Sequence, residues 1–174
     1  MQGNHEGHRI LKFSPAEFWE GLPREEYDRY CSIVEKFPLA VIAKDIIALH
    51  GALPNGTRNV LVPLKKLVNQ IKLGSDDWFR ICWGDFYDKP GEDLGLDIFT
   101  GRPQFGRDYF LKLMKRFNKQ VLIRSHQPDV PQFMFDDRCL TIFTSSAYTR
   151  ERTIAIVDLI KEIKNAKDLE IERI

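Results

Sequence analysis

Two histidines of this chain stand where a side chain could bind a metal ion or move a proton. His50 follows directly after a short apolar run that is typical of a buried strand, and His126 follows such a run after two further residues. Loops at the carboxyl ends of such strands are where α/β proteins build their sites. Near the amino terminus, Asn4 and His5 lie together in a polar segment. Because neutral imidazole and amide oxygen are suitable ligands for Mn, Fe or Zn, these four residues indicate a metal site.

A second interpretation of these residues is structural. A lone histidine at a strand end often does no more than cap that strand, and the spacing of these four residues matches no local zinc motif. The residue types by themselves therefore leave both a metal site and a structural role open. His8 lies outside the pattern, and we expect it to be solvated.

Composition limits the classes of function. The chain has 174 residues, of which 43% are hydrophobic and 29% charged, and this balance predicts a globular domain with a sizeable core. The net charge is +1, so electrostatics favours neither nucleic acid nor a membrane as partner. The three cysteines are far apart and predict reduced thiols in a cytoplasmic protein.

The first half of the chain contains the elements that must position Asn4 and His50. Apolar runs at 39–43 and 46–49 flank Lys44 and Asp45, and this pattern predicts a β-hairpin. A helix is expected to begin with Ser14 as N-cap and Glu17 closing a capping box. A second helix follows Pro23, and its stripe of apolar residues is expected in the core: Tyr27, Tyr30, Cys31, Val34 and Phe37.

The second half repeats the arrangement of a buried strand followed by a histidine. Gly, Pro and Asp are frequent between Tyr87 and Gln104, which predicts a long loop that holds Arg102. The charged run from Lys161 to Asp168 is expected to be a solvated turn. The remaining expected elements are helices at 64–71 and 108–117, a strand at 120–124, a hairpin at 133–143 and closing strands at 153–159 and 169–174.

Six short motifs carry a resemblance to a known family. In this order they resemble the later motifs of the phosphoprotein phosphatase family of serine/threonine phosphatases, within the calcineurin-like metallophosphoesterases. The motifs are Gly3-Asn4-His5-Glu6, His50-Gly51-Ala52-Leu53-Pro54, Trp83-Gly84-Asp85, Phe105-Gly106-Arg107-Asp108, Arg124-Ser125-His126-Gln127 and Phe143-Thr144-Ser145-Ser146-Ala147-Tyr148.

The resemblance implies a fold and a metal centre. The fold is α/β, a metallophosphoesterase-type mixed β-sheet sandwich flanked by helices, with the first strands missing. Residues 1–174 would form a single domain, the carboxyl-terminal part of the family's domain. The family's divalent metals are dinuclear (Mn, Fe or Zn). By resemblance, Asn4, His50 and His126 bind the second metal, so this chain would hold at most that site.

The resemblance also implies catalytic and substrate-binding roles. A metal-activated hydroxide attacks phosphorus, and His5 acts as the general acid that protonates the leaving alcohol. Arg102 and Tyr148 match the positions that contact the substrate phosphate. The expected substrates are a phosphoprotein or a small phosphomonoester, with serine/threonine phosphatase-like chemistry.

The chain departs from the family pattern at three places. Two earlier motifs, Gly-Asp-x-His-Gly and Gly-Asp-x-x-Asp-Arg-Gly, are not found, and they supply the ligands of the first metal. Ala52 replaces a glycine, and Trp83-Gly84-Asp85-Phe86 replaces Trp-Ser-Asp-Pro.

Two hypotheses therefore stay open. The chain is a metal-dependent phosphatase, or it is an inactive fragment or one half of a split phosphatase acting as a binding module. In the second case a partner chain or self-association would complete the fold.

Overall fold

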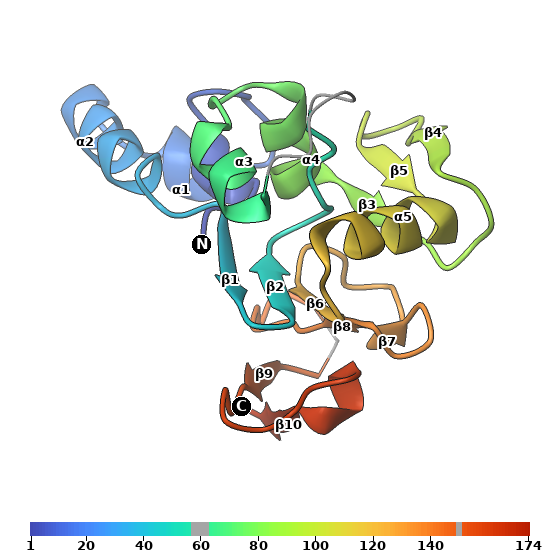
Figure 1. Cartoon of the computed structure of the whole chain (residues 1–174). Coiled ribbons are helices and arrows are strands. Elements are labelled where there is room, and N and C mark those ends of the chain that lie inside the picture. The colour runs from blue at the N-terminus through green and yellow to red at the C-terminus, as the bar shows by residue number, and fades with distance from the viewer. Residues whose placement is uncertain (57–62, 149–150) are drawn as a thin grey trace.

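The computed structural model describes residues 1–56, 63–148 and 151–174. Its centre is a five-stranded mixed sheet with the strand order β1-β2-β6-β8-β7 (Figure 1). β1 and β2 form the predicted antiparallel hairpin, and β7 pairs with β8 as the second one. The bounds of the five strands are Ala40–Ala43, Ile46–Leu49, Val121–Arg124, Cys139–Thr141 and Phe133–Met134.

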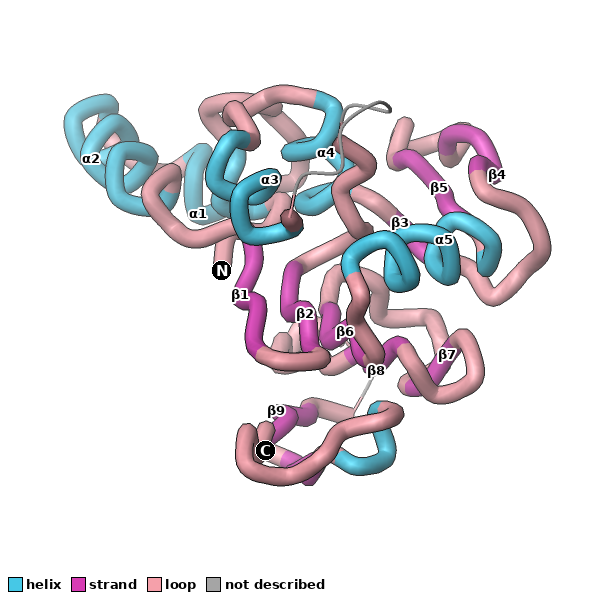
Figure 2. The backbone as a smooth tube through the Cα atoms, in the orientation of Figure 1, coloured by secondary structure: helices cyan, strands magenta, loops and turns pink. Residues whose placement is uncertain are grey.

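Three neighbouring strands of this sheet, β2, β6 and β8, run parallel. Ile46 pairs with Val121, and Ala48 pairs with Ile123. The carboxyl ends of parallel strands meet at the same edge of a sheet. The loops that follow β2, β6 and β8 therefore leave together, although they are far apart in the chain (Figure 2).

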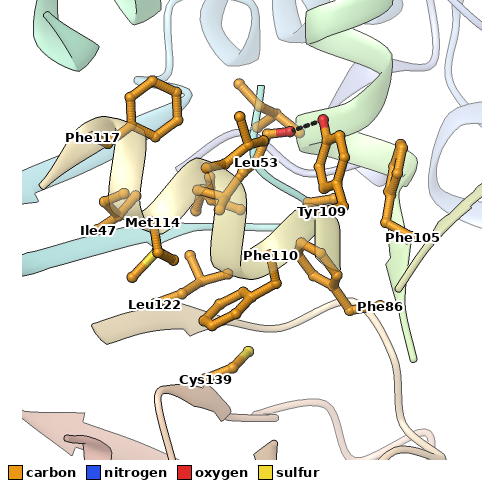
Figure 3. Packing of buried hydrophobic residues seen from close by; sticks show 14 of the residues in the cluster. Ile47, Leu53, Phe86, Phe105, Tyr109, Phe110, Met114, Phe117, Leu122 and Cys139 are labelled. Carbon is orange, nitrogen blue, oxygen red and sulfur yellow. Dashed lines mark hydrogen bonds between the residues drawn. The ribbon is translucent and has the colours of Figure 1, made fainter. Parts of the chain in front are cut away.

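The main hydrophobic core lies between this sheet and three helices. Figure 3 shows α5 packing Phe110 and Met114 against Leu122 of β6, while the Tyr109 hydroxyl donates a hydrogen bond of 2.9 Å to the Leu53 carbonyl. The apolar face that the sequence predicts for this helix is confirmed, because its four residues are all buried: Phe110, Leu113, Met114 and Phe117. The helices are α3 (Leu64–Gln70), α4 (Asp76–Trp83) and α5 (Arg107–Phe117).

A second, smaller core covers the other face of the sheet. The closing strands β9 (Thr153–Ile156) and β10 (Glu170–Arg173) pair antiparallel, as predicted (Figure 1). The expectation of a solvated turn between them is wrong in part. Ile163 and Ala166 are buried against the sheet, and a short 3₁₀ helix, η2 (Ala166–Asp168), lies there. Two buried apolar side chains within a charged run hold the run on the sheet.

The prediction of one long loop between Tyr87 and Gln104 is wrong. The segment contains β4 (Asp93–Leu96) and part of β5 (Pro103–Phe105), which join β3 (Asp85–Phe86) in a sheet of order β3-β5-β4. Glycines that usually indicate loops serve here at turns and at a register shift between strands.

Two expectations for the amino-terminal helices are also wrong. α1 (Glu17–Glu20) is preceded by Ala16 and has no side-chain cap, so Ser14 is not its N-cap. In α2 (Arg24–Val34), Cys31 is buried but Tyr30 is 40% exposed, and Phe37, which lies beyond the end of the helix, is also 40% exposed. α2 lies at the margin of the molecule and packs through one narrow face only (Figure 1).

None of the helices in the described ranges is long and apolar enough to cross a membrane.

Candidate functional site

A cleft of about 590 Å³ opens at the edge where β2, β6 and β8 end. All of the predicted site residues line it, whereas their chemical roles stay predictions. We call Asn4, His50 and His126 the cleft floor, because their side chains contact one another. The cleft rim consists of His5, Arg102 and Tyr148.

Three donor atoms converge in the cleft floor. His50 Nε2 lies 2.9 Å from Asn4 Oδ1 and 3.1 Å from His126 Nδ1. Burial, followed by the Arg124 cation, lowers the pKa of His50 to about 3. Burial and the neighbouring His50 ring lower the pKa of His126 in the same direction. Both imidazoles are therefore neutral at pH 7, which is the form that binds a metal.

The amino-terminal segment is held in place from both sides. The Gln2 backbone N–H donates to the Pro38 carbonyl (3.0 Å), and its side-chain oxygen accepts from Trp78 Nε1 (2.9 Å). Gly3 packs its backbone on the His50 ring so closely that a Cβ there would lie 2.7 Å from His50 Nδ1. These contacts bring Asn4, which is buried, to the end of β2.

His126 is held in an unusual backbone conformation. Its φ is +75°, in the left-handed region that few residues other than glycine adopt, and such strain is concentrated at functional sites. The preceding Ser125 N–H donates to the His50 carbonyl (3.0 Å), which ties the two histidine loops together.

Asp85 stands behind His126 and was not singled out as a site residue from the sequence. Its Oδ1 lies 3.4 Å from His126 Nε2, and burial raises the pKa of Asp85 to about 6. A carboxylate behind an imidazole is the usual support of a metal-ligating histidine. Its place in the motif Trp83-Gly84-Asp85 could have indicated from the sequence that Asp85 belongs to the site.

Arg124 was likewise not singled out as a site residue from the sequence. It is 1% exposed at the end of β6, and its guanidinium donates to the carbonyls of Gly51 (2.8 Å) and Gly84 (3.3 Å). It also donates to the side-chain oxygen of Gln127, which in turn accepts from the Phe86 N–H (2.7 Å). One buried cation thus joins the segments that carry the two histidines and Asp85. Arg124 is a charged residue at the end of an otherwise apolar strand, and this could have indicated its role from the sequence.

The donor set of the cleft floor fits a divalent cation. Ligands at about 2.1 Å from a metal, placed at neighbouring corners of an octahedron, lie about 3.0 Å from each other, close to the two separations seen around His50. His126 Nε2 and Asp85 Oδ1 are both buried without a hydrogen-bond partner in the described residues, as expected where a bound ion orders the ring. Within those residues, no group of three or more His, Cys, Asp and Glu side chains is placed to hold a metal ion, so the donors of the floor are two imidazoles and an amide.

On the cleft rim, Arg102 lies over the Trp83 ring, with its Cζ 5.7 Å from the ring centroid. Its side chain lines the cleft, where a guanidinium can donate to an anion, and its buried Nε has no hydrogen-bond partner in the part of the chain that the structure describes. Tyr148 is 50% exposed and packs its ring edge-on against Phe143.

His5 is exposed at the rim and is held mainly by aromatic neighbours. Its ring lies 4.9 Å from that of Phe13, and its carbonyl accepts a hydrogen bond of 2.7 Å from Trp19 Nε1. Among the described residues, no carboxylate lies within ion-pair distance of the His5 ring. The expectation that His8 is solvated is wrong, because His8 is 7% exposed and stacks on Trp19 with its Nδ1 3.1 Å from the Tyr27 hydroxyl.

A family model described as calcineurin-like phosphoesterase matches residues 1–130. Among solved structures, the fold is similar to a protein serine/threonine phosphatase from Saccharomyces cerevisiae that is described as similar to human phosphatase PP5. The TM-score is 0.72 at 19% identity, and the match covers 98% of this chain and 58% of that chain. No curated protein matches the sequence.

Proposed function

The chain belongs to the calcineurin-like phosphoesterase family, and from this premise we propose that it hydrolyses phosphomonoesters with the help of a bound divalent metal. The observation that carries the proposal is the convergence of two neutral imidazoles and one amide oxygen in a cleft that also holds an unpaired arginine donor. Serine/threonine phosphoproteins and small phosphomonoesters are the proposed substrates, and the cytoplasm the proposed location.

In this proposal Asn4, His50 and His126 hold the cation, with Asp85 fixing the ring of His126. When bound, the cation supplies a nucleophilic water at neutral pH and offsets the negative charge of the phosphate. Mn, Fe and Zn all suit this set of ligands.

The cleft rim would act on the substrate itself. The Arg102 guanidinium is positioned to donate to phosphate oxygens, and its stacking on Trp83 fixes the direction of its donors. His5 would give its proton to the leaving oxygen, because its ring is exposed and lines the cleft. Tyr148 would close the cleft beside the substrate.

The test uses the purified chain and a His126→Ala variant. We expect Mn²⁺ to bind the parent chain in calorimetry and to support hydrolysis of p-nitrophenyl phosphate, and we expect the variant to lose both. Equal Mn²⁺ binding by the two proteins would contradict the assignment of the cleft floor. Mn²⁺ binding without hydrolysis would favour the second proposal below.

The second proposal is that this chain is one half of a site that another polypeptide or a second copy completes. Three observations favour it. The floor offers three donor atoms, and β1 stands at the edge of the sheet order with Val41 52% exposed. The chain also spans 58% of the length of the solved phosphatase chain that it matches. An open strand edge can accept a further strand.

Sedimentation equilibrium separates the two proposals. If the chain needs completion, we expect a mass above that of one chain, or hydrolysis only after a complementing polypeptide is added. A single-chain mass together with full Mn²⁺-dependent hydrolysis would overturn the second proposal.

A further inference from the structure

The turn between β4 and β5 displays large apolar side chains to solvent. Leu96 is 65% exposed, Ile98 86% and Phe99 88%. Single exposed apolar residues are normal on a protein surface, but three within four consecutive positions form a patch. The turn of this hairpin lies at the margin of the molecule (Figure 1), whereas Phe105 at the end of β5 belongs to the main core.

Hydrogen bonds fix the conformation of this turn. Asp97 Oδ1 accepts from the backbone N–H of Phe99 (3.1 Å) and from both the N–H and the hydroxyl of Thr100 (2.8 Å each). The backbone of Gly101 donates to the Asp97 carbonyl (2.9 Å). An apolar patch that is held rigid loses little conformational entropy when a partner covers it.

The same turn is joined to the cleft. The Asp97 N–H donates to the carbonyl of Arg102 (2.9 Å), so the turn is closed by the residue whose guanidinium lines the cleft. Phe99 and Arg102 are three residues apart, which limits their Cα separation to about 11 Å. An extended peptide covers that distance in about three or four residues.

We propose that Leu96, Ile98 and Phe99 form a docking patch for peptide substrates that carry an apolar side chain two to four residues from the phosphorylated residue. This inference rests on the proposed function and narrows its substrate class to phosphopeptides with such an anchor. Phosphate would be held by Arg102 while the anchor covers Phe99 and Ile98.

Charge near the patch argues against a lipid surface as the occupant. Asp93 is exposed at the base of the same hairpin and Asp97 lies in the turn itself, and both carboxylates would repel anionic lipid, whereas Glu92 is paired with Lys112. A peptide whose leucine side chain covers the patch places no negative charge beside these carboxylates.

The experiment measures binding, so that it does not depend on turnover. The probes are fluorescein-labelled nonapeptides with a non-hydrolysable phosphonate analogue of phosphoserine at the centre. At the positions two to four residues from the phosphonate, on both sides, one peptide carries leucine and the other carries alanine. With Mn²⁺ present, we expect the leucine peptide to bind about tenfold tighter than the alanine peptide, the effect of burying part of one apolar side chain.

A double variant and a matched control assign that difference to the patch. Ile98→Ser with Phe99→Ser should remove the tenfold preference, because both side chains are exposed and the fold does not depend on them. Ile160→Ser is the control, since Ile160 is 91% exposed on the segment after β9 and does not line the cleft. That control should keep the preference in full.

Four outcomes would overturn the inference. Equal affinity for the leucine and alanine peptides, or an unchanged preference in the double variant, removes the patch while leaving the proposed function standing. Phosphonate peptides that bind no better than the corresponding serine peptides would refute the proposed function as well. Binding to phosphatidylserine vesicles that the double variant abolishes would reassign the patch to lipid.

Discussion

The floor and the rim of the cleft are built in different ways. Asn4 and His126 are 4% and 7% exposed, and they lie under a network of hydrogen bonds that ends on the buried guanidinium of Arg124. On the rim, His5 is exposed and Tyr148 is 50% exposed, and both are held mainly by contacts between aromatic rings. The floor is thus fixed before any ligand arrives, whereas side chains of the rim can still adjust to one.

This difference suits the two tasks of a phosphoesterase site. A metal centre needs donor atoms held close to their final separation, because each misplaced ligand weakens binding. Phosphate esters differ in the groups around the phosphate, so the side chains that contact them need to be exposed enough to adjust to each ester. It follows that substitutions under the floor should affect stability and metal binding, whereas substitutions on the rim should affect only the binding of substrate.

The largest expected effect comes from Arg124→Met. The change leaves the carbonyls of Gly51 and Gly84 buried without their donor, and we expect it to lower the free energy of unfolding by about 3 kcal/mol in urea denaturation. Arg173→Met is the control, because its side chain is 80% exposed, and it should change stability by less than about 0.5 kcal/mol. Similar stability of the two variants would break the distinction between floor and rim.

The next effect is expected from Gly3→Ala. A Cβ at position 3 would lie 2.7 Å from His50 Nδ1, so the ring must move and the donor atoms separate. We expect Mn²⁺ affinity to fall about tenfold or more in calorimetric titration. Gly21→Ala adds the same atom where the nearest contact is an ordinary 3.5 Å, and it should bind Mn²⁺ like the parent chain. Unchanged affinity in the Gly3 variant would show that the floor is not tightly fixed.

On the rim, Arg102→Ala should leave the protein folded and weaken its hold on anions. Loss of a charge-assisted hydrogen bond predicts about tenfold lower affinity for inorganic phosphate in the presence of Mn²⁺. Because Arg102 is only partly buried, stability should change by less than about 1 kcal/mol. Arg29→Ala, at an exposed position of α2, is the control. A collapse of stability without a change in phosphate affinity would place Arg102 with the floor.

The smallest effect is expected from Tyr148→Phe. The ring packs on Phe143 and is half exposed, so removal of the hydroxyl should change phosphate affinity by less than about twofold. A loss of tenfold in the same titration would mean that the hydroxyl itself contacts phosphate, and the rim would then be more specific than its exposure suggests.

Local patterns predicted much of the fold. Both hairpins, the apolar face of α5 and the closing strands follow from alternation and periodicity of short range. Local patterns failed where the environment of a residue depends on contacts with distant parts of the chain. Tyr30 matched a helical stripe but lies on a helix with few neighbours, and the glycines between Tyr87 and Gln104 serve strands rather than a loop.

One departure from the family pattern is explained only in three dimensions. A Cβ at Gly84 would lie 2.6 Å from the Cβ of Ala52 and 2.5 Å from the Arg80 carbonyl. The two positions where the motifs differ therefore face each other, and the methyl group at one excludes a side chain at the other. Sequence comparison alone counts them as separate changes.

The sequence by itself determined which groups are available: two imidazoles after apolar strands, an amide near the amino terminus, and the ordered motifs of a phosphoesterase family. The tertiary structure decided that they meet. His50 contacts residues 46 and 76 positions away, and those contacts exist because β2 and β6 are parallel neighbours and Arg124 joins their loops. Strand register and buried hydrogen bonds of this kind arise from packing between distant segments, which no local pattern of residues encodes.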